Sequence, residues 1–147
     1  MDYSEKSIDL GNSIKDHKIQ DGEERYKNII FYQEDIKSFL LIVDNEQDKF
    51  DLIHDKGTFD AFLLNKNNSN IEYVDYIYYK LKKSGVFIIT SCNHLKGDLI
   101  KFFIEDPKLN KEKYKFSIKG EIPHKSFSFE GQVGQTVTTL IFSIEKF

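Results

Sequence analysis

The stretch KFDLIHDKGTFDAF, residues 49–62, constrains the fold most, because it predicts a strand, a sharp turn and a helix in immediate succession. A short apolar run that begins at Phe50 stops at Asp55, and residues 56–58 lead into a helix-like segment. In an open α/β sheet, the carboxyl ends of the strands line the ligand crevice. We therefore expect a binding or reacting group at Asp55.

Further along the chain, strand and helix patterns alternate. Residues 28–33 read as a compact strand, and apolar residues from Ile71 to Leu81 recur at helical spacing, with Gly85 placed to end that helix. Residues 86–90 are apolar without alternation, which is typical of a strand covered on both faces by helices. An amphipathic helix follows and must end near Pro107. This alternation predicts an α/β fold with a parallel sheet.

In the last third of the chain, the spacing of apolar residues changes from a helical period to the alternation typical of strands. Residues 113–119 alternate between apolar and polar side chains, and residues 136–144 form a second β-rich run. The segment between them, residues 124–135, contains glycines and reads as a loop. We expect two antiparallel strands that close an otherwise parallel sheet.

Length and charge narrow the class of protein. A chain of 147 residues predicts one domain, residues 1–147. The net charge of −3 provides no general basic field for nucleic acid. The chain has one cysteine, and it shows neither a secretory segment nor an apolar run that would span a membrane. We expect a cytosolic protein that contacts neither nucleic acid nor membrane directly.

Histidine and cysteine offer no strong catalytic or metal pattern. His54 lies between Asp51 and Asp55, where it is either a general base or a packed, hydrogen-bonded histidine, and we favour the second. Cys92 lacks a histidine partner at catalytic spacing, so a small packing residue is favoured over a nucleophile. No metal-ligand spacing is present, and we predict no metal site.

Three sequence blocks agree in order and spacing with one protein family. They are DYSEKSI at residues 2–8, DKGTFDA at 55–61 with TSCN at 90–93, and FSFEGQVGQTVTT at 127–139. Together they resemble the class I, seven-stranded protein-lysine methyltransferases that use S-adenosylmethionine, in particular those that methylate translation elongation factor 1-alpha. The chain departs from that family at His94-Leu95, where Trp-Thr is usual, and at Glu130, where Gly is common. Both departures bear on substrate contacts.

The resemblance implies a Rossmann-like methyltransferase sheet with helices on both faces and a C-terminal antiparallel hairpin. It also implies S-adenosylmethionine as cofactor, with an acidic residue on the ribose hydroxyls and another on the adenine amino group. The residues assigned to the cofactor are Asp2, Tyr3, Glu34, Asp35, Ile36 and Asp55. From the residues alone, Asp2 is equally a helix cap. For the acidic residues past residue 33, the residues alone favour a role in solubility over a role in binding.

For catalysis, the resemblance places Asp55 against the incoming amine, with Lys56, Gly57 and Thr58 shaping the turn. A lysine with a pKa of about 10.4 must lose a proton first, so the site needs desolvation and a proton acceptor. Phe59 is either a wall of the lysine channel or a packing residue, and Asp60 is equally a charge at a helix start.

In the family, a strand and a Gly-x-Gly turn open the fold, and neither precedes Asp2. We therefore expect an N-terminally truncated domain in which the first strand and the glycine-rich turn are missing, or a sheet completed by rearrangement or by a homodimer. The alternative function is an inactive methyltransferase-fold remnant that acts as a binding or assembly module. Methylation of another nucleophile is a third option, although the chain lacks the Asn/Asp-Pro-Pro-Tyr tetrapeptide typical of enzymes that methylate nucleic-acid bases.

Overall fold

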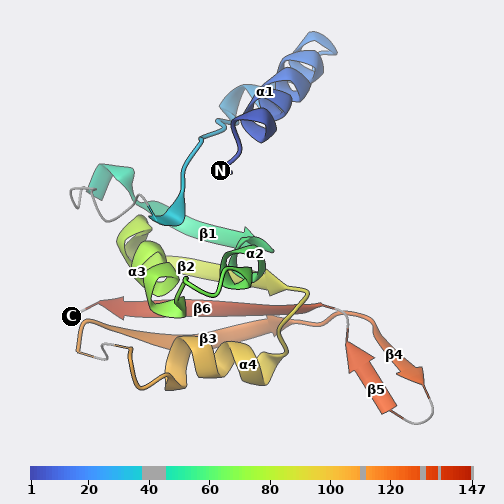
Figure 1. Cartoon of the computed structure of the whole chain (residues 1–147). Coiled ribbons are helices and arrows are strands. Elements are labelled where there is room, and N and C mark those ends of the chain that lie inside the picture. Colours follow the sequence, from blue (N-terminus) through green and yellow to red (C-terminus); the bar gives the residue numbers. More distant parts are fainter. Residues whose placement is uncertain (38–45, 110–111, 130–131, 136, 147) are drawn as a thin grey trace. The chain divides into compact units, whose positions relative to one another are not determined.

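The structure is a computed structural model that describes residues 1–37, 46–109, 112–129, 132–135 and 137–146. The chain divides into two compact units, Met1–Ile42 and Val43–Phe147. Each unit is described by itself (Figure 1).

The first unit contains the helix α1, Glu5–Gln20, and the 3-10 helix η1, Glu24–Asn28. Ser4 is the N-cap of α1, and its side chain accepts a hydrogen bond from the Ser7 N–H. The compact strand predicted at residues 28–33 is not formed, because only Gln33 pairs there, in an isolated parallel bridge with Asp2. Asp2 N–H donates to Tyr32 O, and Glu34 N–H donates to Asp2 O, both at 3.0 Å.

The second unit is built on a four-stranded sheet of order β1-β2-β6-β3. The strands are β1 (Phe50–Lys56), β2 (Leu81–Ser91), β3 (Tyr114–Ile122) and β6 (Thr138–Lys146). β1 and β2 are parallel, whereas β6 is antiparallel to both of its neighbours. The predicted mixed α/β sheet with an antiparallel ending is therefore confirmed.

Helices connect the strands, and a small hairpin interrupts the last connection (Figure 1). The 3-10 helix η3, Glu46–Asp48, precedes β1, and the helices α2 (Thr58–Leu64) and α3 (Asn70–Lys80) join β1 to β2. The helix α4, Lys96–Ile100, continues into the π-helical turn η4, Lys101–Glu105. The segment predicted as a loop contains β4 (Ser126–Phe129) and β5 (Gln132–Gln135), which pair with each other. The prediction of a plain loop was therefore wrong.

The predicted helix end at Gly85 was also wrong. α3 stops at Lys80, and β2 begins at once with Leu81, so Gly85 lies inside the strand. A Cβ atom on Gly85 would stand 2.6 Å from Cγ of Leu81, which is fully buried. Glycine is required there by this close approach and not by a helix cap.

The core lies on one face of the sheet. The rings of Phe87 of β2 and Phe142 of β6 stack with their centroids 6.1 Å apart, and the ring of Phe103 of η4 contacts both. Tyr73 of α3 and Phe59 of α2 join the same cluster. The contacts therefore pack α2, α3 and η4 against this face. The alternate residues of the strands point to the opposite face, and among them Leu52, Val86, Ile88 and Ile141 are half-buried or exposed.

Within the described ranges, no helix is both long and apolar enough to cross a membrane.

Candidate active site

Asp55 stands at the end of β1 and caps the helix that follows. Gly57 adopts a left-handed conformation with φ of +85°, which turns the chain into α2. Oδ1 of Asp55 accepts a hydrogen bond from Thr58 N–H at 2.9 Å, and Oδ2 accepts one from Phe59 N–H at 3.0 Å. The carboxylate thus satisfies two of the backbone donors that the first turn of a helix leaves unpaired.

Tyr73 completes the surroundings of this carboxylate. Its hydroxyl donates to Oδ2 of Asp55 at 2.5 Å, and Asp55 is only 6% exposed. Burial raises the pKa of Asp55 above its ordinary value, against the hydrogen bonds from Tyr73, Thr58 and Phe59, which lower it. Burial, together with the nearby Asp55 charge, raises the pKa of Tyr73 well above its ordinary value, so the phenol remains a donor at neutral pH.

The other residues predicted for catalysis lie on the open side of the turn. Lys56 and Thr58 are exposed, Gly57 is half-buried, and Asp55 is buried beneath them. Oδ1 of Asp55 accepts one hydrogen bond from the described residues, which leaves it a second acceptor position.

A second polar cluster follows β2. Asp60, in the first turn of α2, is 7% exposed and accepts hydrogen bonds from Ser91 Oγ at 2.5 Å, Cys92 N–H at 2.8 Å and His94 Nδ1 at 3.1 Å. Burial raises the pKa of Asp60, but these three hydrogen bonds outweigh it and hold the pKa below its ordinary value. Asp60 is therefore an ionised acceptor that anchors the turn after β2.

The two turns are neighbours because their strands are neighbours. Lys56 pairs with Thr90 across β1 and β2, and Gly57 N–H donates to Thr90 O at 3.1 Å. The centroid of the buried Phe59 ring lies 4.8 Å from the centroid of the Tyr73 ring and 5.5 Å from that of the His94 ring. The Asp55 and Asp60 clusters therefore lie together at the carboxyl ends of the parallel strands β1 and β2.

On the other side of the sheet, a polar row crosses the strands near the same end. Nε2 of His54 lies 3.2 Å from Thr90 Oγ1, which lies 2.9 Å from Thr139 Oγ1, and Nε2 of His124 lies 2.7 Å from Thr139 Oγ1. The predicted hydrogen bonding of His54 is confirmed, although its side chain is exposed and not packed. Cys92 is exposed too, so its predicted packing role was wrong.

Most of the residues predicted for the cofactor lie in the first unit. The bridge between Asp2 and Gln33 brings Asp2 beside the segment that leads into Glu34, Asp35 and Ile36. The carboxylates suit a nucleoside, whose hydroxyl and amino groups are hydrogen-bond donors. Tyr3 is 76% exposed and Ile36 is 8% exposed. Asp55, the remaining member of the set, belongs to the other unit.

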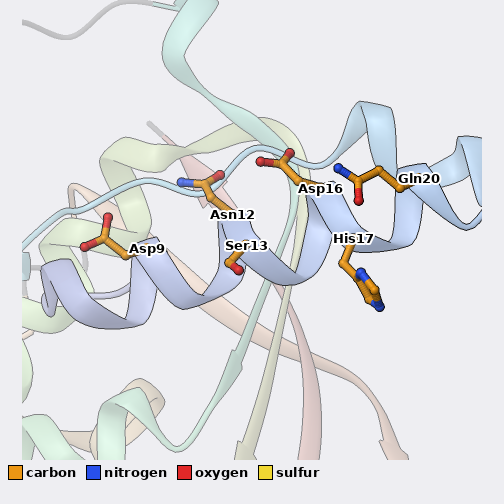
Figure 2. A pocket seen from close by; sticks show the side chains of 6 residues that line it. All are labelled: Asp9, Asn12, Ser13, Asp16, His17 and Gln20. Carbon is orange, nitrogen blue, oxygen red and sulfur yellow. The ribbon is translucent and has the colours of Figure 1, made fainter.

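A shallow hollow also runs along α1, on the same unit (Figure 2). It is lined at helical spacing by Asp9, Asn12, Ser13, Asp16, His17 and Gln20. None of these side chains belongs to the predicted site. Within the described ranges, no group of histidine, cysteine and carboxylate side chains has the arrangement of a metal site.

The sequence did not predict the hydrogen-bonding roles of three residues at this site, Asp60, Tyr73 and His94. Asp60 looked like an ordinary charge at a helix start, and Tyr73 belongs to the apolar stripe of α3. The departure at His94 was visible in the sequence, but its partner was not, because 34 positions separate it from Asp60.

The mixed α/β sheet, the strand–turn–helix unit at Asp55 and the polar turn after β2 are consistent with a truncated Rossmann-like methyltransferase fold. Residues 1–133 match the model of the family described as "Methyltransferase domain", and the chain belongs to this family.

Its curated relatives include "EEF1A lysine methyltransferase 2" of Homo sapiens, which is 34% identical over 97% of this chain and 53% of the relative. The Danio rerio protein of the same name is also 34% identical, over 97% of this chain and 54% of the relative. "Protein-lysine N-methyltransferase EFM4" of Saccharomyces cerevisiae is 34% identical over 97% of this chain and 57% of the relative. The chain thus spans about half the length of these relatives. No solved structure matches it.

Proposed function

We propose that the protein transfers a methyl group from S-adenosylmethionine to a lysine side chain of another protein, with translation elongation factor 1-alpha as the substrate. The observation that carries this proposal is the Asp55-Lys56-Gly57-Thr58 turn, in which a buried carboxylate at a strand end retains an acceptor position on Oδ1. The names of the relatives support lysine as the acceptor and the elongation factor as the substrate.

In this proposal the protein mainly positions two reactants, because S-adenosylmethionine supplies an already activated methyl group when it is bound. Oδ1 of Asp55 accepts a hydrogen bond from the substrate amine and orients it. Lys56, Gly57 and Thr58 form the rim over which the lysine enters. Phe59 keeps its ring inside the core, at 1% exposure, so it supports the turn from beneath and does not line the channel.

The nucleoside of the cofactor is assigned to the first unit. The Asp2 carboxylate would accept hydrogen bonds from the ribose hydroxyls, and Asp35, with Glu34 and Ile36 beside it, would hold the adenine amino group. Oδ1 of Asp2 accepts one hydrogen bond from Ser4 N–H at 2.8 Å, and Oδ1 of Asp35 accepts one from Lys37 N–H at 2.9 Å. A carboxylate offers about four acceptor positions, so the Asp2 carboxylate retains capacity for a ligand.

Thermal unfolding with and without S-adenosylhomocysteine tests cofactor binding. A ligand at about 100 times its dissociation constant should add about 2.7 kcal/mol to the free energy of unfolding. Asp2→Ala should reduce the shift, whereas Asp9→Ala, on the exposed face of α1, should not. An unchanged shift in Asp2→Ala would contradict the assignment of the ribose.

Transfer itself is tested with radiolabelled S-adenosylmethionine and purified elongation factor 1-alpha. Label should appear on a lysine of the factor with the wild-type chain and fall strongly with Asp55→Ala. Binding of the factor without any transfer would overturn the proposed activity and favour a binding or assembly module. Label on nucleic acid would move the proposal to another acceptor.

Two further parts of the proposal concern the cellular location and the oligomeric state of the protein. We place it in the cytosol, where fluorescence microscopy of the tagged protein should find it. A homodimer would form along β1, the edge strand of the four-stranded sheet, where Phe50 and Leu52 are 48% and 53% exposed. Light scattering measures the molar mass, and a monomer at all concentrations would contradict the homodimer.

A further inference from the structure

The hydrogen bonds around His94 determine which of its ring nitrogens carries the proton. Nδ1 lies 3.1 Å from Oδ1 of Asp60 and 3.3 Å from Oγ of Ser91. The single hydroxyl proton of Ser91 is already donated to Asp60 at 2.5 Å, and the Asp60 carboxylate has none to give. The proton between Nδ1 and Asp60 must therefore belong to His94. A neutral ring then has its lone pair on Nε2.

Asp60 is well suited to hold a charged partner. It stays ionised because the Ser91 hydroxyl, the Cys92 N–H and the His94 ring all donate to it, which lowers its pKa below the ordinary value. A carboxylate bonded to Nδ1–H orients an imidazole and stabilises the imidazolium that forms when Nε2 takes up a proton. The arrangement is that of an oriented base.

The ring of His94 is held in place, and its outer nitrogen is left available. Phe59 of α2 and Phe102 of η4 contact the ring at centroid distances of 5.5 Å and 5.1 Å. The side chain is 19% exposed, and no described residue forms a hydrogen bond with Nε2. Among the described elements packed against the ring, α2 contributes the charge of Asp60, η4 contributes the Phe102 ring, and the end of β2 contributes the Ser91 hydroxyl.

His94 also lies at the same end of the parallel strands as Asp55. Its turn follows β2, whose neighbour β1 ends at Asp55, and the Phe59 ring touches both the His94 ring and the Tyr73 ring that bonds Asp55. Asp55 itself is 6% exposed and engaged in three hydrogen bonds, so it is poorly placed to carry a proton away. His94 offers at the same end of the strands a basic atom with a route to water.

We propose that Nε2 of His94, oriented by Asp60, is the base that accepts a proton from the substrate lysine before methyl transfer. The inference rests on the proposed function. The N–H bond of the lysine ammonium breaks and an N–H bond forms on Nε2. The freed lone pair of the amine then forms the new C–N bond while the donor's S–CH3 bond breaks. The imidazolium afterwards releases its proton to water, and Asp60 remains a carboxylate throughout.

Two substitutions separate the base from its structural setting. His94→Asn retains an N–H donor for Asp60 but has no group that titrates. His94→Phe retains the ring contacts with Phe59 and Phe102 but has no nitrogen. General base catalysis is typically worth about 100-fold or more, so both variants should lower kcat by about 100-fold at neutral pH while KM for the protein substrate stays unchanged. His17→Asn, a 75% exposed histidine on α1, is the matched control and should retain full activity.

The pH profile and the ring tautomer supply readouts that a merely structural role would not move. Wild-type kcat should fall at acid pH, and this fall should disappear in His94→Asn. Nitrogen-15 NMR of the intact chain should show that the neutral His94 ring carries its proton on Nδ1 and has an unprotonated Nε2.

A proton on Nε2 in the neutral ring would overturn the proposal, and so would an unchanged kcat and an unchanged fall at acid pH in His94→Asn. Absence of any transfer by the wild-type chain would instead refute the proposed function, and the base role with it. The NMR measurement would still decide whether Asp60 fixes the tautomer, so the two failures remain distinguishable.

Discussion

Asp55 and Asp60 belong to one strand–turn–helix unit, yet their pKa values shift in opposite directions. Burial dominates at Asp55 and raises its pKa, whereas the three hydrogen bonds to Asp60 outweigh burial and lower its pKa. Environments that separate two carboxylates in this way commonly mark acid–base sites. Here Asp60 supplies a carboxylate charge to His94, and at Asp55 the hydrogen bond from Tyr73 opposes the effect of burial on the pKa.

Tyr73→Phe tests that dependence. The variant removes the hydroxyl that donates to Oδ2 of Asp55 without changing the ring packing against Phe59. A hydrogen bond to a charged group contributes about 1.5–3 kcal/mol, so the free energy of unfolding at neutral pH should fall by about that amount. Urea unfolding monitored by circular dichroism measures it. Tyr32→Phe, at a side chain that is 53% exposed, is the control and should change stability by less than about 0.5 kcal/mol.

The pH dependence of the same variant has a definite sign. The pKa of Asp55 is raised in the folded state, so its contribution to stability is greatest below the unfolded pKa and is lost as pH rises through the folded pKa. The Tyr73 hydrogen bond lowers the pKa of Asp55, and its removal extends this loss to higher pH. The penalty of Tyr73→Phe should therefore shrink on acidification. A penalty that grows toward acid would show that the bond does not favour the carboxylate.

At the scale of elements, the turn from β1 into α2 depends on the backbone of Gly57. Its φ of +85° is unfavourable for residues with a side chain, so Gly57→Ala should cost about 1–2 kcal/mol in the free energy of unfolding even though its Cβ would meet no atom within 4 Å. Gly97→Ala is the matched control. Its Cβ would also meet nothing, but Gly97 lies inside α4, so the substitution should be neutral or stabilising by up to about 1 kcal/mol. Equal effects in urea unfolding would refute the backbone argument.

The elements also show what local patterns can and cannot predict. The strand–turn–helix at Asp55 was predictable, because a short apolar run, a glycine and a helical period stand in order. The passage from α3 to β2 was not, because Leu81 fits the apolar spacing of the helix and is also the first buried residue of the strand. The strand predicted before Glu34 failed for a different reason, since strands need partners and only Asp2 pairs there.

The same limit applies to the site. Asp55 was predictable from its place at a strand end, and the structure shows it buried at the turn. Its bond to Tyr73, and the bond from Asp60 to His94, join segments that are distant along the chain. A period in the sequence reports which face a residue occupies, but it does not report which polar atom it meets.

At the scale of the whole molecule, the family match and the two units divide the chain differently. The match covers residues 1–133 and so includes parts of both units. The proposed nucleoside residues Asp2 and Asp35 lie in one unit, and the proposed catalytic turn at Asp55 lies in the other. The single domain of residues 1–147 stays a prediction. The proposed activity requires residues of both units. We expect the free energy of unfolding to come mainly from the second unit, Val43–Phe147.

A chain of residues 43–147 should therefore fold cooperatively and yet fail to bind cofactor. Every buried apolar residue of the described ranges except Ile36 lies in that unit, whereas α1 has no buried residue, and helices of its length depend on packing for stability. Circular dichroism should show a cooperative urea transition for residues 43–147 and little structure for residues 1–42. S-adenosylhomocysteine should not raise the melting temperature of residues 43–147, because the proposed ribose and adenine contacts are removed. A disordered 43–147 chain would mean that the aromatic core cannot hold the sheet alone, and a normal ligand shift would mean that the nucleoside binds elsewhere.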